Sequence, residues 1–80
     1  QEKFEIYPNP TSGQFTVNFN AQLNPTIISV RSITGQLMKE INVLGNPQQN
    51  FDLSELDNGI YFISIPTKDG IASKKIIKTN

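Results

Sequence analysis

The 80-residue sequence contains no cysteine, no histidine and no tryptophan. Without cysteine and histidine, the chain offers no thiol or imidazole nucleophile, no disulfide and no Cys/His zinc site. No apolar run approaches the roughly 20 residues of a membrane-spanning helix, so we expect no membrane insertion. Seven basic residues balance seven acidic ones, which gives no electrostatic case for binding nucleic acid. These absences argue against an enzyme, and we expect no cofactor and no catalytic or metal-binding residue.

The length predicts a single domain over residues 1–80 with a small core, because a chain of this size buries only about 60–65% of its unfolded surface. The sequence begins with Gln1 and shows no charged-then-apolar leader. We therefore expect the domain to be part of a longer or processed protein.

Short stretches of alternating apolar and polar residues run along the whole chain, and the clearest is Phe15–Phe19. Turn residues separate these stretches at intervals of about 8–12 residues, which is typical of an all-β sandwich without substantial helix. In the stretch 37–44 the apolar residues fall on both faces, and a bulge would reconcile this pattern. Seven strands are predicted, over residues 4–7, 15–19, 28–31, 37–44, 51–53, 60–65 and 71–78.

The most apolar stretch, Ile60–Ile65, follows the turn signal Asp57-Asn58-Gly59. Large side chains on both of its faces indicate a central strand that is covered on both sides. The pattern is also typical of a tyrosine corner, in which the Tyr61 hydroxyl bonds back to the turn backbone. In that interpretation Leu53 and Leu56 fill the edge of the core, and in the alternative Tyr61 is simply a core aromatic.

The acidic residues near the turns are candidates for carboxylate chemistry. Pairs of carboxylates could serve glycoside hydrolysis or calcium binding. Aspartate is also favoured in turns because it bonds its own backbone, and this explains Asp57 and Asp69. The turn carboxylates are Asp52, Glu55, Asp57 and Asp69.

The last predicted strand is unusual because it ends in the run S-K-K-I-I-K, residues 73–78. Lysine on an edge strand prevents edge-to-edge aggregation, which is one explanation of the run. The other is that a partner recognises this basic and apolar strand.

Four stretches, in this order and spacing, resemble one known family over nearly the whole chain. They are Y-P-N-P-T-S-G at 7–13 with F-T-V at 15–17, I-S-V-R-S-I-T-G-Q-L-M at 28–38, D-L-S-E-L-D-N-G-I-Y-F-I at 52–63, and D-G-I-A-S-K-K-I-I-K at 69–78. Together they resemble the type A C-terminal sorting domain of the type IX (Por) secretion system of Bacteroidota. Arg31 departs from the family, which often carries an aromatic residue there.

The resemblance implies a seven-stranded, Ig-like antiparallel β-sandwich that acts as the C-terminal sorting signal of a larger secreted protein. The implied partners are an outer-membrane translocon, an N-terminal passenger domain and a sortase-like peptidase that removes the signal. The passenger would cross the periplasm and outer membrane, and would be secreted or kept at the cell surface.

The resemblance also implies roles for individual residues. Because the family's final strand is tied to export, recognition is expected at Lys74, Lys75, Ile76, Ile77 and Lys78. We further hypothesise that the C-terminal edge is recognised partly by backbone pairing. The remaining motif residues are expected to be mainly structural: Tyr7, Pro8, Asn9, Pro10, Gly13, Gly35, Leu53, Leu56, Gly59 and Tyr61.

A second hypothesis is an accessory Ig-like module of a secreted enzyme, acting as a spacer or binding polysaccharide. A carbohydrate-binding module should present a line of solvent-facing Trp or Tyr side chains. The chain has no tryptophan and two tyrosines, and Tyr7 is the one aromatic predicted on a polar face.

Overall fold

The structure is a computed structural model that describes residues 4–19, 27–43, 48–67 and 70–79. It confirms the all-β prediction, although the fourth strand ends two residues earlier than expected and the fifth begins three residues earlier. None of the described residues belongs to a helix long and apolar enough to cross a membrane. The strands are β1 (Phe4–Tyr7), β2 (Gln14–Phe19), β3 (Ile27–Ser32), β4 (Leu37–Asn42), β5 (Gln48–Asp52), β6 (Gly59–Thr67) and β7 (Gly70–Lys78).

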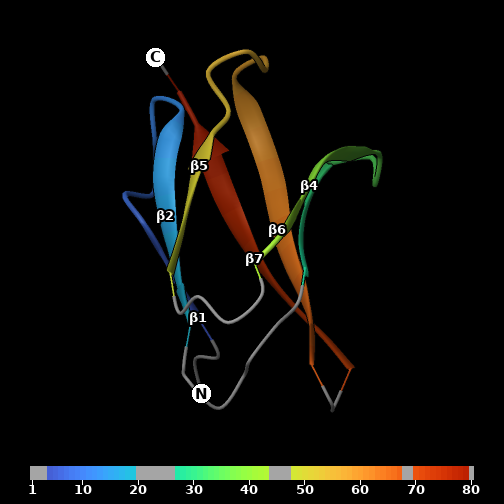
Figure 1. The fold of residues 1–80 in the computed structure, drawn as a ribbon. Coiled ribbons are helices and arrows are strands. Elements are labelled where there is room, and N and C mark those ends of the chain that lie inside the picture. Colours follow the sequence, from blue (N-terminus) through green and yellow to red (C-terminus); the bar gives the residue numbers. More distant parts are fainter. Residues whose placement is uncertain (1–3, 20–26, 44–47, 68–69, 80) are drawn as a thin grey trace.

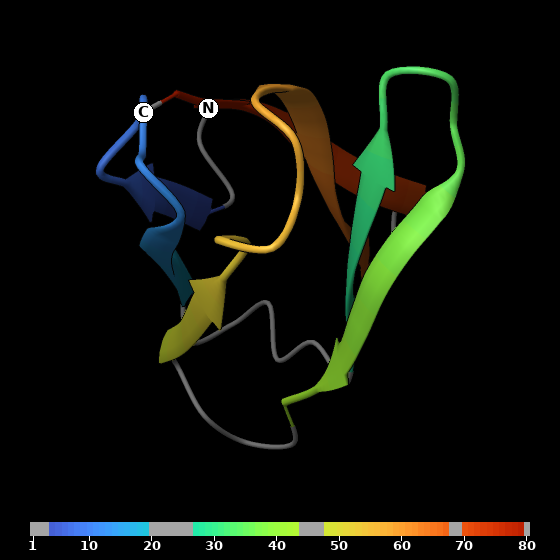
Figure 2. The same cartoon turned by 90° about the horizontal axis from the view of Figure 1, so that it is seen from above.

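The strands form two antiparallel sheets that face each other as a sandwich (Figures 1 and 2). One sheet has the order β1-β2-β5, and the other has the order β4-β3-β6-β7. Alternation explains the layers, since every second residue of β2 is buried while the residues between are exposed or half-buried. The core between the sheets consists of Phe4, Phe15, Val17, Phe19, Ile28, Val30, Val43, Phe51, Leu53, Tyr61, Ile63, Ile65 and Ile76.

β6 is central in its sheet, as predicted, because it lies between β3 and β7. Its inner residues Tyr61, Ile63 and Ile65 are buried, which confirms the predicted face. The expectation that both faces are covered is wrong, since Ile60 and Phe62 on the other face are only half-buried. The described residues form two layers, and within them that face is shielded by neighbouring strands of the same sheet.

The bulge expected near Leu37 is present. Val30 pairs with Lys39 and Arg31 pairs with Leu37, so Met38 is the extra residue on β4. The turn before it is closed by Gly35, whose φ of 94° lies in the left-handed region.

The tyrosine corner is also present. The Tyr61 hydroxyl donates to the Asp57 carbonyl at 2.6 Å, while the rest of its side chain is buried. Leu53 is 1% exposed and Leu56 packs against the core, as expected for residues that fill its edge. Figure 2 shows the segment between β5 and β6 passing across the space between the two sheets.

Candidate functional site at the C-terminal strand

Three of the four motif stretches meet at one end of the sandwich, which we call the motif end. It comprises the segment Pro8–Gly13, the loop Leu53–Asn58 and the last residues of β7. In Figure 1 it lies at the top, where the chain terminus approaches the blue segment between β1 and β2. The segment that follows β1 is therefore a neighbour of the C-terminal residues here.

Asn9 holds the outer edge of β7 with both atoms of its side-chain amide. Its Nδ2 donates to the Lys75 carbonyl at 3.0 Å, and its Oδ1 accepts from the Ile77 amide at 3.0 Å. The side chain therefore satisfies one acceptor and one donor that an edge strand would otherwise leave unpaired. Pro8 and Pro10 flank it and are exposed, with φ restricted by their rings.

Thr11 continues this pairing with its backbone. Its amide donates to the Ile77 carbonyl at 2.9 Å, and its carbonyl accepts from the Thr79 amide at 2.8 Å. The Thr11 hydroxyl, buried with the rest of the residue, donates to the Gln14 carbonyl at 2.6 Å. The outward backbone groups of β7 that Asn9 and Thr11 bind are therefore not free to pair with a partner strand while the domain keeps this fold.

Gly13 joins the Pro8–Gly13 segment to the loop after β5. Its carbonyl accepts from the Leu53 amide at 2.8 Å. Its φ is 147°, and a Cβ at this position would lie 2.7 Å from the Ser54 Oγ. Glycine is required here by both the backbone conformation and the close approach.

The five residues expected to be recognised divide between the two faces of β7. Ile76 is 0% exposed and Lys78 is 5% exposed, so both are built into the domain. The Lys78 ammonium donates to the Asn58 Oδ1 at 3.1 Å, which links the end of β7 to the turn before β6. Lys75 is exposed and Ile77 half-buried on the outer face of the sheet.

Lys74 shares the inward side of β7 but lies at the margin of the core. It is half-buried, and its Nζ lies 5.9 Å from the centre of the Phe4 ring. This distance is within the range of a cation–π interaction with β1 of the other sheet.

The remaining motif residues lie in the core, at turns and strand ends, and at the surface. Leu53 and Tyr61 are in the core, Gly35 forms a turn and Gly59 begins β6. Tyr7 is 43% exposed, and its hydroxyl accepts from the side-chain Nε2 of Gln48 at 3.1 Å.

The sequence did not indicate Thr11 as a partner of β7, and it indicated Asn58 only as part of the turn signal 57–59. Both lie inside the quoted motif stretches, where Thr and Asn also fit ordinary turn positions. Their partners in β7 are 20 or more residues away in sequence, and the alternation of apolar and polar residues does not predict such contacts.

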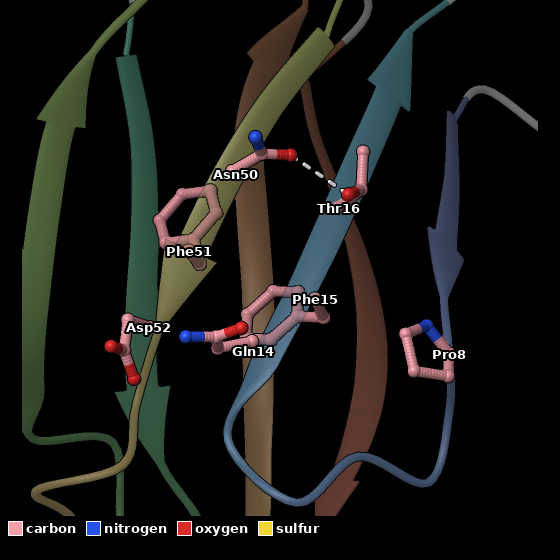
Figure 3. A pocket seen from close by; sticks show the side chains of 7 residues that line it. All are labelled: Pro8, Gln14, Phe15, Thr16, Asn50, Phe51 and Asp52. Atoms are coloured by element: carbon pink, nitrogen blue, oxygen red, sulfur yellow. Dashed lines mark hydrogen bonds between the residues drawn. The ribbon is translucent and has the colours of Figure 1, made fainter.

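A shallow hollow of about 470 Å³ lies on the outer face of the three-stranded sheet (Figure 3). The Thr16 hydroxyl donates to Asn50 Oδ1 across it at 2.8 Å. Phe15 and Phe51 are buried and stack on each other with ring centres 5.2 Å apart. They therefore present no exposed platform for a sugar ring. The hollow is lined by Pro8, Gln14, Phe15, Thr16, Asn50, Phe51 and Asp52.

Asp52, at the rim of this hollow, is bound by its own loop. Its Oδ1 accepts from the Ser54 hydroxyl and from the Ser54 amide. These bonds, the hydroxyl first, hold the pKa of the Asp52 carboxyl below its ordinary value. The described part of the chain contains no group of three or more acidic, His or Cys side chains that could hold a metal ion. Asp69 lies outside the described residues.

Comparison with known proteins identifies one family. The model of the secretion system C-terminal sorting domain matches residues 5–79. No curated protein matches the chain. The matched region contains all of the motif end and all but the first residue of the seven strands. The chain therefore belongs to the family of C-terminal sorting domains of the type IX secretion system.

Proposed function

We propose that residues 1–80 are the C-terminal domain of a larger protein and direct that protein through the outer-membrane translocon of the type IX system. The observation that carries the proposal is the family match over residues 5–79. A sorting-signal family is not an enzyme family, in agreement with the scarcity of catalytic side chains in the sequence.

The route and the partners extend this proposal. A passenger joined before β1 would cross the periplasm and the outer membrane together with the domain. A sortase-like peptidase would then remove the domain, leaving the passenger secreted or at the cell surface.

Within β7 the proposed recognition residues have different tasks. Lys75 and Ile77 face outward and are available to a partner of the folded domain. Ile76 and Lys78 are buried, so they support recognition by keeping the strand in place. Lys74 lies at the margin of the core beside Phe4, and it supports recognition by holding β7 against β1.

A fusion experiment tests the proposal. A periplasm-targeted fluorescent protein carrying residues 1–80 at its C-terminus is expressed in a type IX-competent bacterium. Fluorescence should reach the medium or the cell surface. It should stay in the periplasm in a matched strain without the translocon, and in a fusion without the domain.

Retention of the intact fusion in the competent strain, with the domain shown to be folded, would contradict the proposal. That outcome would favour the accessory-module alternative and a search for ligands.

A further inference from the structure

The outer face of the four-stranded sheet carries a small apolar and basic area near the motif end. We call it the outer-face patch. In the register, Leu37, Arg31, Phe62 and Lys75 lie in one row across β4, β3, β6 and β7. Ile60 and Ile77 form the next row, because residues two apart on a strand share a face. The outer-face patch consists of Arg31, Leu37, Ile60, Phe62, Lys75 and Ile77.

The apolar side chains of this patch are reachable from solvent. Leu37 is 43% exposed, and the other three are half-buried. Arg31 and Lys75 are exposed on either side of Phe62 in the register. The patch thus has an apolar centre at Ile60, Phe62 and Ile77 with basic residues beside it, and Leu37 lies beyond Arg31. An apolar centre with a polar rim is the usual composition of a protein interface.

On the side of the Arg31–Phe62–Lys75 row away from Ile60 and Ile77, the adjacent row of the same face is polar and limits the patch. It contains Ser29, Ser64 and Ser73, and the Ser64 and Ser73 hydroxyls are bonded at 3.0 Å. Glu40 ends this row on β4, with its carboxylate 3.5 Å from the Ser29 hydroxyl. No acidic residue belongs to the patch itself.

Three separate motif stretches, 28–38, 52–63 and 69–78, supply these six residues. Their inward-facing side chains, such as Val30, Ile63 and Ile76, are accounted for by the core. Burial in the core does not explain why Ile60, Phe62 and Ile77 are apolar, because they lie on the solvent side of the sheet.

Resting on the proposed function, we propose that the outer-face patch is the surface through which the secretion machinery binds the folded domain. The partner is a protein that presents an apolar side chain flanked by carboxylates. Charge complementarity supports this choice, since Arg31 and Lys75 give the patch two positive charges and no negative one. Side-chain recognition also fits a strand whose outer backbone edge is already bonded to Asn9 and Thr11.

A protein partner fits better than an anionic membrane surface. Two basic residues supply little attraction to anionic lipid, where polybasic segments use clusters of four to eight. The apolar side chains are also half-buried in the sheet rather than projecting as wedges into a bilayer.

The test uses the fluorescent fusion in the competent strain. Arg31→Glu/Lys75→Glu should lower export by about tenfold or more, because attraction is replaced by like-charge repulsion across the interface. Phe62→Ser should also lower export, whereas Arg31→Lys/Lys75→Arg should keep it. Lys39→Glu is the matched control, since it reverses an exposed charge on β4 outside the patch. The Lys39 Nζ donates to the Asp52 carbonyl at 3.1 Å, so normal export is expected of the variant once its melt shows that it is folded. Thermal melts of each purified fusion establish that the domain is folded.

Export of folded Arg31→Glu/Lys75→Glu and Phe62→Ser at the unmodified level would overturn the patch proposal while leaving the sorting function intact. If the doubly reversed variant does not fold, Arg31→Gln/Lys75→Gln replaces it, and unchanged export of that variant is the contrary result. Failure of the unmodified fusion to export contradicts the proposed function itself. Binding of the purified fusion to phosphatidylserine vesicles that is lost in the double variant would overturn the choice of a protein partner.

Discussion

Individual side chains at the motif end take the place of backbone partners. The amide of Asn9 pairs with β7 as a neighbouring strand would, and the hydroxyl of Tyr61 closes the turn before β6. Because such bonds are few and specific, single substitutions should have effects that depend on burial rather than on residue type.

Tyr61→Phe removes only the hydroxyl that bonds the Asp57 carbonyl. We expect a loss of about 1 kcal/mol in the free energy of unfolding, measured by urea denaturation, since a partly buried hydrogen bond is lost. Tyr7→Phe is the matched control, because its hydroxyl bonds Gln48 at the surface and its loss should have a smaller effect. Equal effects of the two substitutions would show that the corner bond adds no more stability than the surface hydrogen bond.

Gly13→Ala should destabilise the domain more than Gly59→Ala. The two glycines have similar φ values, 147° and 153°, so the cost of forcing alanine into this backbone conformation should be similar at both positions. A Cβ at Gly13 meets the Ser54 Oγ at 2.7 Å, whereas a Cβ at Gly59 meets nothing within 4 Å. The difference should be about 1–3 kcal/mol, as for overpacking in a tight site. Similar melting temperatures for the two variants would contradict the close approach.

The Asp52 carboxylate should make stability depend on pH in the acid range. Its pKa is lowered in the folded state, mainly by the Ser54 hydroxyl, so the stabilisation is present above the unfolded-state pKa. It is lost as the pH falls from that value, near 3.8, through the lower folded-state pKa. Asp52→Asn should therefore be less stable than the unmodified domain at pH 7, with the gap closing below about pH 4. A gap that stays constant on acid titration is the contrary result.

Among the elements, β7 is the strand most dependent on distant parts of the chain. It pairs with β6 along its full length, while Asn9 and Thr11 bond the outer edge of its last residues. The two sheets are thus connected by hydrogen bonds at the motif end as well as by the core.

Asn9→Ala should expose the Ile77 amide on the outer edge of β7. We expect faster hydrogen exchange at Ile77, because the substitution removes its acceptor. Amides of β7 that point toward β6 should be much less affected. Asn50→Ala is the control, since the Asn50 side chain bonds only Thr16 among the bonds described for it and lies on the other sheet. Unchanged exchange at Ile77 would argue against the Asn9 bond.

The elements themselves were predictable from alternation and turn residues. Alternating residues predicted β2 and the buried face of β6, and the turn residues before Tyr61 predicted its corner. The burial of the outer face of β6 was predicted wrongly. Apolar residues on both faces of the strand indicated a covering layer on each side, whereas Ile60 and Phe62 are half-buried. The pairing of Thr11 with β7 could not be predicted, since its partners are distant in sequence and the contact is a single parallel bridge.

At the scale of the whole molecule, β7 should be indispensable for folding. Truncation after Ser73 removes Ile76 from the core and the hydrogen bond that Lys78 makes with Asn58. A small domain is stable by only about 5–15 kcal/mol, and loss of a buried isoleucine with half a strand should leave the truncated chain unfolded. Circular dichroism and one-dimensional NMR of the truncated domain provide the measurement.

A dispersed NMR spectrum and a cooperative melt from the truncated chain would contradict this expectation. The expectation bears on export experiments, because a truncation that unfolds the domain removes its surface patch together with its last strand. Point substitutions at outward-facing positions separate the two effects.

The chain enters β1 at the end of the sandwich away from the motif end (Figure 1). The domain is 34 Å long, so a passenger attached before Phe4 would be held on the far side from the terminus of β7. Cargo of widely different size and shape could then be carried without shielding the motif end from a receptor. The same polarity would orient a docked complex, with the signal leading and the cargo trailing behind it.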